Sequence, residues 1–216
     1  MDSCDRSEYT QQTASSAHFK IPDDLPSKMT RLNAGGRRDA SVLIPLLEKE
    51  DGLHILFEVR SAGIRQGGEV CFPGGRVDED EDSCSTAVRE ACEELLVDAS
   101  QIRVLAPMFR MTGPGGREIH SWLGMLEGYR GTYSEGEVAE VFTMPVRWFL
   151  DHPPQIFHAQ YVVDLPEDFP WEMLPGGRAY PWQNVPKNYY FYETPHAVIW
   201  GMTAELLYNC IERLRG

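Results

Sequence analysis

Apolar positions along the chain fall into short runs separated by turn residues, the pattern of a domain rich in strands. Residues 40–47 (ASVLIPLL) and 53–60 (LHILFEVR) each form such a run, with turn residues 49–52 between them. This arrangement predicts a β-hairpin. Further strands are predicted over 102–110, 119–127 and 138–146, and a short helix over 145–151.

A helical period marks residues 83–96. The apolar positions of this segment recur at the spacing of a buried helical stripe: Cys84, Ala87, Val88, Ala91, Cys92 and Leu95. This spacing predicts an amphipathic helix, with Asp82 or Ser83 available as the N-cap. The tail, residues 197–215, is also predicted to be helical.

Three segments lack a clear period. Residues 1–17 are polar and predicted to form a flexible arm, followed by one domain over 18–216 that opens with a short helix after Pro22. Residues 61–75 are rich in glycine and predict a loop around at most a brief strand. Residues 152–192 are crowded with Pro, Trp, Tyr and Phe. We expect their aromatic side chains to pack in the core or line a pocket.

Charge and composition exclude several classes of protein. The 216 residues hold 20 Lys and Arg against 33 Asp and Glu, a formal charge of −13, which disfavours a nucleic-acid partner. No apolar run approaches the roughly 18 residues of a membrane helix, and no secretory leader is evident, so no membrane partner is expected. The five cysteines include no C-x-x-C pair. Reduced thiols and a cytoplasmic location are therefore expected.

The acidic residues concentrate between positions 78 and 98, where Arg89 is the one basic residue. A helix advances about 100° per residue, so Glu90, Glu93 and Glu94 share one sector of it. Taken alone, such acids most often form a solvated face. They repel one another, however, and a divalent cation would relieve that repulsion. Ligands that are all oxygen favour Mg²⁺ or Mn²⁺.

These residues match a known pattern. Gly75, Glu81, Arg89, Glu90 and the pair Glu93-Glu94 resemble the Nudix box, G-x5-E-x7-R-E-U-x-E-E-x-G-U, where U is aliphatic.

The resemblance implies a fold, a reaction and a set of site residues. The fold is an α/β class Nudix α/β/α sandwich with a mixed β-sheet. The reaction is metal-dependent hydrolysis of a small-molecule nucleoside diphosphate linked to another moiety, with Glu90, Glu93 and Glu94 as metal and base candidates. Arg89 and Glu81 are included among the catalytic candidates, and the more plausible role for them is an ion pair that holds the acidic loop.

Two features of the box region leave alternatives open. Leu96 stands where the pattern has glycine, so we expect an altered turn or a longer helix, with the metal site retained. Some relatives take their catalytic base from a later loop, where Glu137 and Glu140 are the candidates. An exposed edge position is the simpler reading of either one.

The segment before the box resembles the signature of the coenzyme A pyrophosphatase branch, LLTxRSx3Rx3Gx3FPGG. Residues 56–61 (LFEVRS), Arg65, Gly68 and residues 72–75 (FPGG) carry the match. Phe57-Glu58 replace Leu-Thr, and the loop after Arg65 is one residue shorter than the pattern. Residues 196–204 also resemble the closing helix of that branch, and His196 itself is expected to pack or cap.

This second resemblance implies cleavage of the pyrophosphate bond of coenzyme A or acyl-CoA. The products would be adenosine 3′,5′-bisphosphate and 4′-phosphopantetheine or its acyl form. The residues expected to bind the substrate are Arg60, Ser61, Arg65, Gly74 and Gly75. The guanidinium groups of Arg60 and Arg65 match phosphates bidentately, and the alternative for either arginine is a structural pairing with a nearby acid. A Nudix hydrolase of ADP-ribose or nucleotide sugars and a non-catalytic binding module remain alternatives. The oligomeric state is open, with a homodimer among the options.

Overall fold

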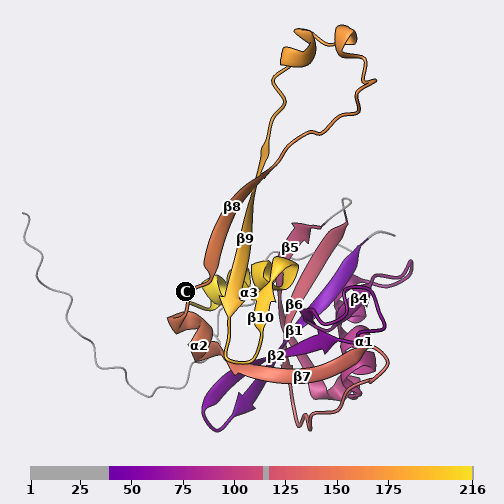
Figure 1. Ribbon diagram of the computed structural model, residues 1–216. Coiled ribbons are helices and arrows are strands. Elements are labelled where there is room, and N and C mark those ends of the chain that lie inside the picture. Colours follow the sequence, from indigo (N-terminus) through magenta and orange to yellow (C-terminus); the bar gives the residue numbers. More distant parts are fainter. Residues whose placement is uncertain (1–38, 114–116, 216) are drawn as a thin grey trace, which may run out of the picture.

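A mixed seven-stranded sheet forms the centre of the molecule in the computed structural model, which describes residues 39–113 and 117–215 (Figure 1). Its strands are β1 (Ala40–Lys49), β2 (Gly52–Arg60), β3 (Val70–Cys71), β4 (Gly74–Arg76), β5 (Ile102–Thr112), β6 (Glu118–Leu126) and β7 (Val138–Pro145). The order is β3-β2-β1-β6-β5, with β4 pairing to β1 and β7 to β2. β1 and β6 run parallel, and β1 and β2 form the predicted hairpin. The flexible segment predicted over residues 1–17 and the helix predicted after Pro22 lie outside the described residues.

Helices cover both faces of this sheet. Helix α1 (Ser83–Leu95) buries Ala87 and Ala91 against Leu43 and Leu56 on one face. On the other face, helices α2 (Val146–Asp151) and α3 (Gly201–Arg215) pack on a second cluster that includes Phe57. Leu56 and Phe57 are consecutive on β2, so the period of two along the strand divides the core between the faces. This arrangement confirms the predicted α/β class with a mixed sheet.

A second sheet lies beside α3. Its strands are β8 (Gln155–Tyr161), β9 (Val185–Glu193) and β10 (Val198–Trp200), in the order β10-β9-β8. The β8–β9 hairpin, with the loop that joins these strands, extends away from the body as an arm (Figure 1). The short 3₁₀ turns Trp171–Met173 and Gly177–Ala179 lie near the arm's tip, and a third, Ala99–Gln101, follows α1.

The expectation that the aromatic side chains of this region pack in the core or line a pocket is correct for several of them. Tyr190 and Tyr192 join the core, and Phe157, Tyr189 and Phe191 line a pocket, although every residue of β8 is exposed. Near the tip, Trp182 contacts Phe169 and Tyr180. The aromatic side chains therefore pack mainly along the arm itself.

The predicted tail helix begins later than expected. Residues 198–200 pair with β9 as the strand β10, and the helix starts at Gly201, whose φ is +63°. These residues pair with β9 instead of starting the helix, since Val, Ile and Trp favour strands.

Candidate functional site

Helix α1 starts at a side-chain cap. The Asp82 carboxylate accepts hydrogen bonds from the backbone N–H groups of Cys84 and Ser85, at 2.8 and 3.0 Å. Asp82, rather than Ser83, is therefore the N-cap. The cap and the buried Ala87 and Ala91 together set which flank of the helix turns toward the loop before it.

The helix ends at Leu95, and Leu96 itself adopts the left-handed conformation, with φ 53° and ψ 50°. The backbone N–H of Val97 donates to Cys92 O at 3.2 Å. A later loop covers the last carbonyls: Thr132 Oγ1 donates to Leu95 O and Ser134 N–H to Glu94 O, each at 2.7 Å. The expected altered turn or longer helix is therefore wrong. The chain makes the turn that a glycine would make, because the loop satisfies the carbonyl groups there.

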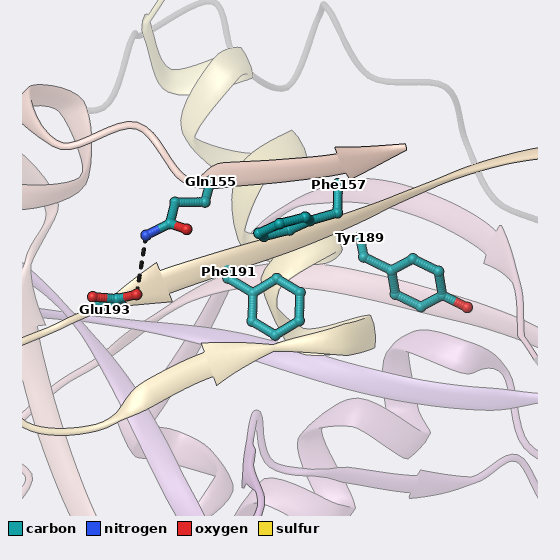
Figure 2. A pocket seen from close by; sticks show the side chains of 5 residues that line it. All are labelled: Gln155, Phe157, Tyr189, Phe191 and Glu193. Atoms are coloured by element: carbon teal, nitrogen blue, oxygen red, sulfur yellow. Dashed lines mark hydrogen bonds between the residues drawn. The ribbon is translucent and has the colours of Figure 1, made fainter. Parts of the chain in front are cut away.

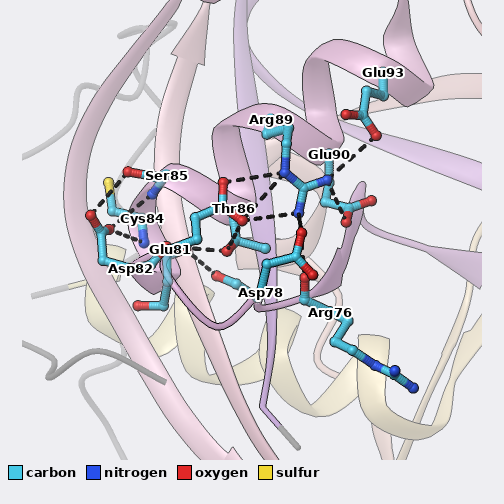
Figure 3. Close-up of polar contacts among 12 residues, drawn as sticks. Arg76, Asp78, Glu81, Asp82, Cys84, Ser85, Thr86, Arg89, Glu90 and Glu93 are labelled. Carbon is cyan, nitrogen blue, oxygen red and sulfur yellow. Dashed lines mark hydrogen bonds and ion pairs between the residues drawn. The ribbon is translucent and has the colours of Figure 1, made fainter. Parts of the chain in front are cut away.

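Arg89 binds the acidic loop and two of the helical glutamates (Figure 3). Its guanidinium donates to Glu81 at 3.0 Å, to Glu90 at 2.9 Å and to Glu93 at 3.4 Å. The hydrogen bond with Glu81 is the largest influence raising the pKa of Arg89, and the same bond lowers the pKa of Glu81. Glu81 also accepts from Thr86 Oγ1 at 2.8 Å. The geometry is that of the expected ion pair between Arg89 and Glu81.

The three glutamates of α1 occupy three different environments. Glu93 has 58% of its side chain exposed, whereas Glu94 is only 5% exposed. Glu94 Oε2 accepts from the backbone N–H of Gly74 at 2.7 Å, and burial raises its pKa to about 7. Glu90 lies so close to Gly75 that a Cβ there would be 2.2 Å from its carboxylate carbon. Burial also raises the pKa of Glu90.

The end of β2 reaches the same carboxylates. Arg60 lowers the pKa of Glu94, whereas Glu137 raises it, so both charges act on this carboxylate. Ser61 N–H donates to Glu137 O at 2.8 Å, and Arg60 Nε donates to Arg65 O at 3.1 Å. The Arg65 residue is exposed. The structure thus gathers Arg60, Ser61 and Glu137 around Glu94, with Arg65 at the rim.

The two candidate bases after the box differ in their neighbours: Glu137 lies just before β7 beside the carboxylates of α1, whereas Glu140 lies on β7 itself. The charge of Glu137 affects both Glu90 and Glu94. Glu140 instead pairs with His196, with its Oε1 2.9 Å from His196 Nε2. The tail histidine therefore has a polar partner as well as a stacking contact with Phe142.

Sequence reasoning missed Glu58 as a member of this site. It is 1% exposed, and burial followed by the charge of Glu94 raises its pKa well above the usual range. A usable signal was present, since an acidic residue interrupts an otherwise apolar strand at a position where the signature has Thr.

The donor set suits a hard divalent cation although it is not preassembled. Across residues 39–113 and 117–215, no three His, Cys, Asp or Glu side chains stand arranged as a metal site. Arg89 instead takes the carboxylates of Glu90 and Glu93. Oxygen donors from Glu90, Glu93 and Glu94 beside a glycine backbone are nevertheless the type that Mg²⁺ and Mn²⁺ accept.

Among the described helices, none is long and apolar enough to cross a membrane.

A separate cavity of about 440 Å³ lies on one face of the paired strands β8 and β9 (Figure 2). Its lining residues are Gln155, Phe157, Tyr189, Phe191 and Glu193. Gln155 donates to Glu193 at 3.0 Å. This lining contains no basic side chain, so the cavity is unsuited to a phosphate group.

The chain is similar in sequence to several known proteins. The NUDIX domain family matches residues 37–165. The mouse peroxisomal coenzyme A diphosphatase NUDT7 is 32% identical over 156 residues, which cover 68% of this chain and 65% of that protein. A Nudix hydrolase of Photorhabdus laumondii, NudL, described as uncharacterized, is 27% identical over 88% of this chain and 92% of its own length. The crystal structure of the M. smegmatis Nudix hydrolase RenU covers 55% of this chain and 78% of its own, at 25% identity and a TM-score of 0.47. With a family match over more than half of its length, the chain belongs to the Nudix family.

Proposed function

We propose that this protein hydrolyses the pyrophosphate bond of coenzyme A or acyl-CoA with Mg²⁺ or Mn²⁺. One observation carries the proposal. The buried Glu94 carboxylate is bound by the Gly74 backbone and lies within the electrostatic reach of Arg60. A carboxylate that can hold a cation, a backbone N–H bound to that carboxylate, and an arginine that can bind phosphate thus come together at one place.

Glu90, Glu93 and Glu94 are the residues that would hold the metal. Bound divalent cations supply positive charge for the phosphate oxygens and activate water. Arg60 and Arg65 bind and orient the phosphates. The carboxylate of Glu94 or Glu137 accepts the proton of the attacking water, which requires only that one of them is ionised at the working pH.

The choice of substrate rests on the signature before the box and on the mouse relative. Arg60, Ser61 and the FPGG loop match the coenzyme A branch. The absence of a side chain at Gly75 lets the backbone come close to Glu90, and the Gly74 N–H donates to Glu94. A chain of formal charge −13 needs such local cations to accept a substrate as anionic as coenzyme A.

A substrate panel tests this proposal. Purified protein with Mn²⁺ is incubated separately with coenzyme A, an acyl-CoA, ADP-ribose and a nucleotide sugar, and products are identified by mass. We expect adenosine 3′,5′-bisphosphate and 4′-phosphopantetheine, formed faster than any other product pair. Glu94→Gln should abolish turnover, whereas the matched Glu212→Gln on α3 should not.

Two results would replace the proposal by another. Equal turnover across the panel would favour the ADP-ribose and nucleotide-sugar class. Coenzyme A binding without metal-stimulated hydrolysis would favour a non-catalytic binding module.

We also propose a cytoplasmic location and leave a homodimer as the state to test. The described cysteines Cys71, Cys84, Cys92 and Cys210 are free thiols, which suits a reducing compartment. The mouse relative is named peroxisomal, so imaging of a fluorescent fusion decides between the two compartments. Light scattering of the purified protein measures the mass of the assembly.

A further inference from the structure

A buried carboxylate on β2 lies on the same face of the sheet as helix α1. Side chains alternate along a strand, and Leu56 belongs to the same buried cluster as Ala91 and Leu95 of that helix. Glu58 is two residues further, so it lies on the face that α1 covers. Phe57, between them, stacks with Phe72 and Phe142 in the opposite core.

The Glu58 carboxylate lacks the partners that a buried charge requires. It is 1% exposed, and its Oε1 atom has no hydrogen-bond partner. Its Oε2 atom has Cys71 Sγ at 3.9 Å, and a thiol is a weak donor. The nearby hydroxyl of Tyr129 donates elsewhere, to the backbone oxygen of Thr132. A buried acid in this state is costly unless it is neutralised.

The charges around Glu58 are mainly of the same sign. Glu94 on α1 and Glu137 before β7 are negative charges that act on Glu58, and Arg60 is a positive charge that acts on it. Arg60 acts on Glu94 as well, so one arginine serves two buried carboxylates. A second positive centre among Glu58, Glu94 and Glu137 would relieve the repulsion.

We propose that Glu58 is an additional oxygen ligand of the divalent cation, reaching it from β2 on the sheet face that α1 covers. The inference rests on the proposed function, because it assumes a cation held by Glu94. It places one ligand on β2 in addition to those of the Nudix box. Threonine, the residue of the coenzyme A signature at this position, could offer only a neutral hydroxyl.

Binding of Mn²⁺ alone tests this inference. The full chain is titrated at constant pH without nucleotide, and free Mn²⁺ is followed by its EPR signal. The variants are Glu58→Gln, which keeps the shape, and Glu58→Thr, which restores the signature residue. We expect both to weaken at least one Mn²⁺ site tenfold or more. The matched control Glu212→Gln, an exposed acid on α3, should bind as the wild type does.

A second measurement is the melting temperature, which a bound metal ion raises. Saturating Mn²⁺ should raise the melting temperature of the wild type more than that of either Glu58 variant. Melting curves without metal show that each variant is folded. Burial disfavours the charged form of Glu58, and Glu58→Gln puts a neutral amide of the same shape in its place, so we expect its metal-free form to be no less stable than the wild type. Should either variant fail to fold, the other carries the test.

The outcomes separate this inference from the function on which it rests. Mn²⁺ affinities within twofold of the wild type in the folded Glu58 variants overturn the ligand role, whatever the activity. A wild type that binds no Mn²⁺ overturns both proposals. Weaker Mn²⁺ binding in the variants, together with a wild type that leaves coenzyme A intact, supports the ligand and overturns only the substrate.

Discussion

The left-handed turn at Leu96 leads to a prediction with a definite sign. Leu96 has φ 53° and ψ 50° and is 58% exposed. The informative perturbation is the pair Leu96→Ala and Leu96→Gly, because the two variants differ by one methyl group. Comparing them with each other removes the loss of leucine packing, which both share.

The magnitude follows from the backbone. A left-handed conformation costs a residue with a Cβ roughly 1–2 kcal/mol, and glycine avoids this cost. Glycine loses about 0.5–1 kcal/mol of this advantage through its greater freedom in the unfolded chain. We therefore expect Leu96→Gly to be more stable than Leu96→Ala by about 0.5–1 kcal/mol. For a chain of this size, that corresponds to roughly 1–4 °C in melting temperature.

Urea denaturation measures this difference, with equal m values showing that the unfolded states are comparable. The control pair is Cys92→Ala and Cys92→Gly, inside the same helix one turn earlier. There alanine should be favoured by about 0.8–1 kcal/mol, the ordinary helix preference. The reasoning is refuted if alanine is also favoured at position 96, since that order belongs to a residue within a helix.

Three further predictions concern the carboxylates of α1. Glu93→Gln and Glu94→Gln should each lower kcat by two or more orders of magnitude, while circular dichroism shows an intact fold; full activity in both would remove them from the mechanism. Gly75→Ala should lower both stability and kcat, because its Cβ would be 2.2 Å from the Glu90 carboxylate carbon; unchanged melting and turnover would contradict that contact. Burial raises the pKa of Glu94 from 4.5 to about 7, so the folded, metal-free protein binds its proton more tightly than the unfolded chain does. The contribution of Glu94 to the free energy of unfolding should therefore fall as pH rises from about 4.5 to about 7, by at most about 1.4 kcal/mol per pH unit. If the free energy of unfolding of Glu94→Gln has the same pH dependence as that of the wild type, Glu94 does not make this contribution.

Local patterns predict most of the regular elements well. The hairpin of residues 40–60 and the helix over 83–95 have clear apolar periods, and the structure reproduces them within about two residues. The turn at Leu96 differs from the expectation. The carbonyl groups that precede it accept hydrogen bonds from Thr132 and Ser134, which lie more than thirty residues later in the chain. The arm over 155–193 could not be foreseen, because its strands bury little and leave no two-sided apolar pattern.

The residue types and spacing of the acidic helix were enough to identify the family and three candidate ligands, because a Nudix box is a local pattern on one helix and its preceding loop. How those carboxylates differ from one another depended on long-range packing. Gly74 binds Glu94, Arg89 spans Glu90 and Glu93, and Glu58 enters from a strand that precedes the helix. Burial and neighbouring charge set the pKa of each acid, and both depend on segments that meet only when the sheet has formed.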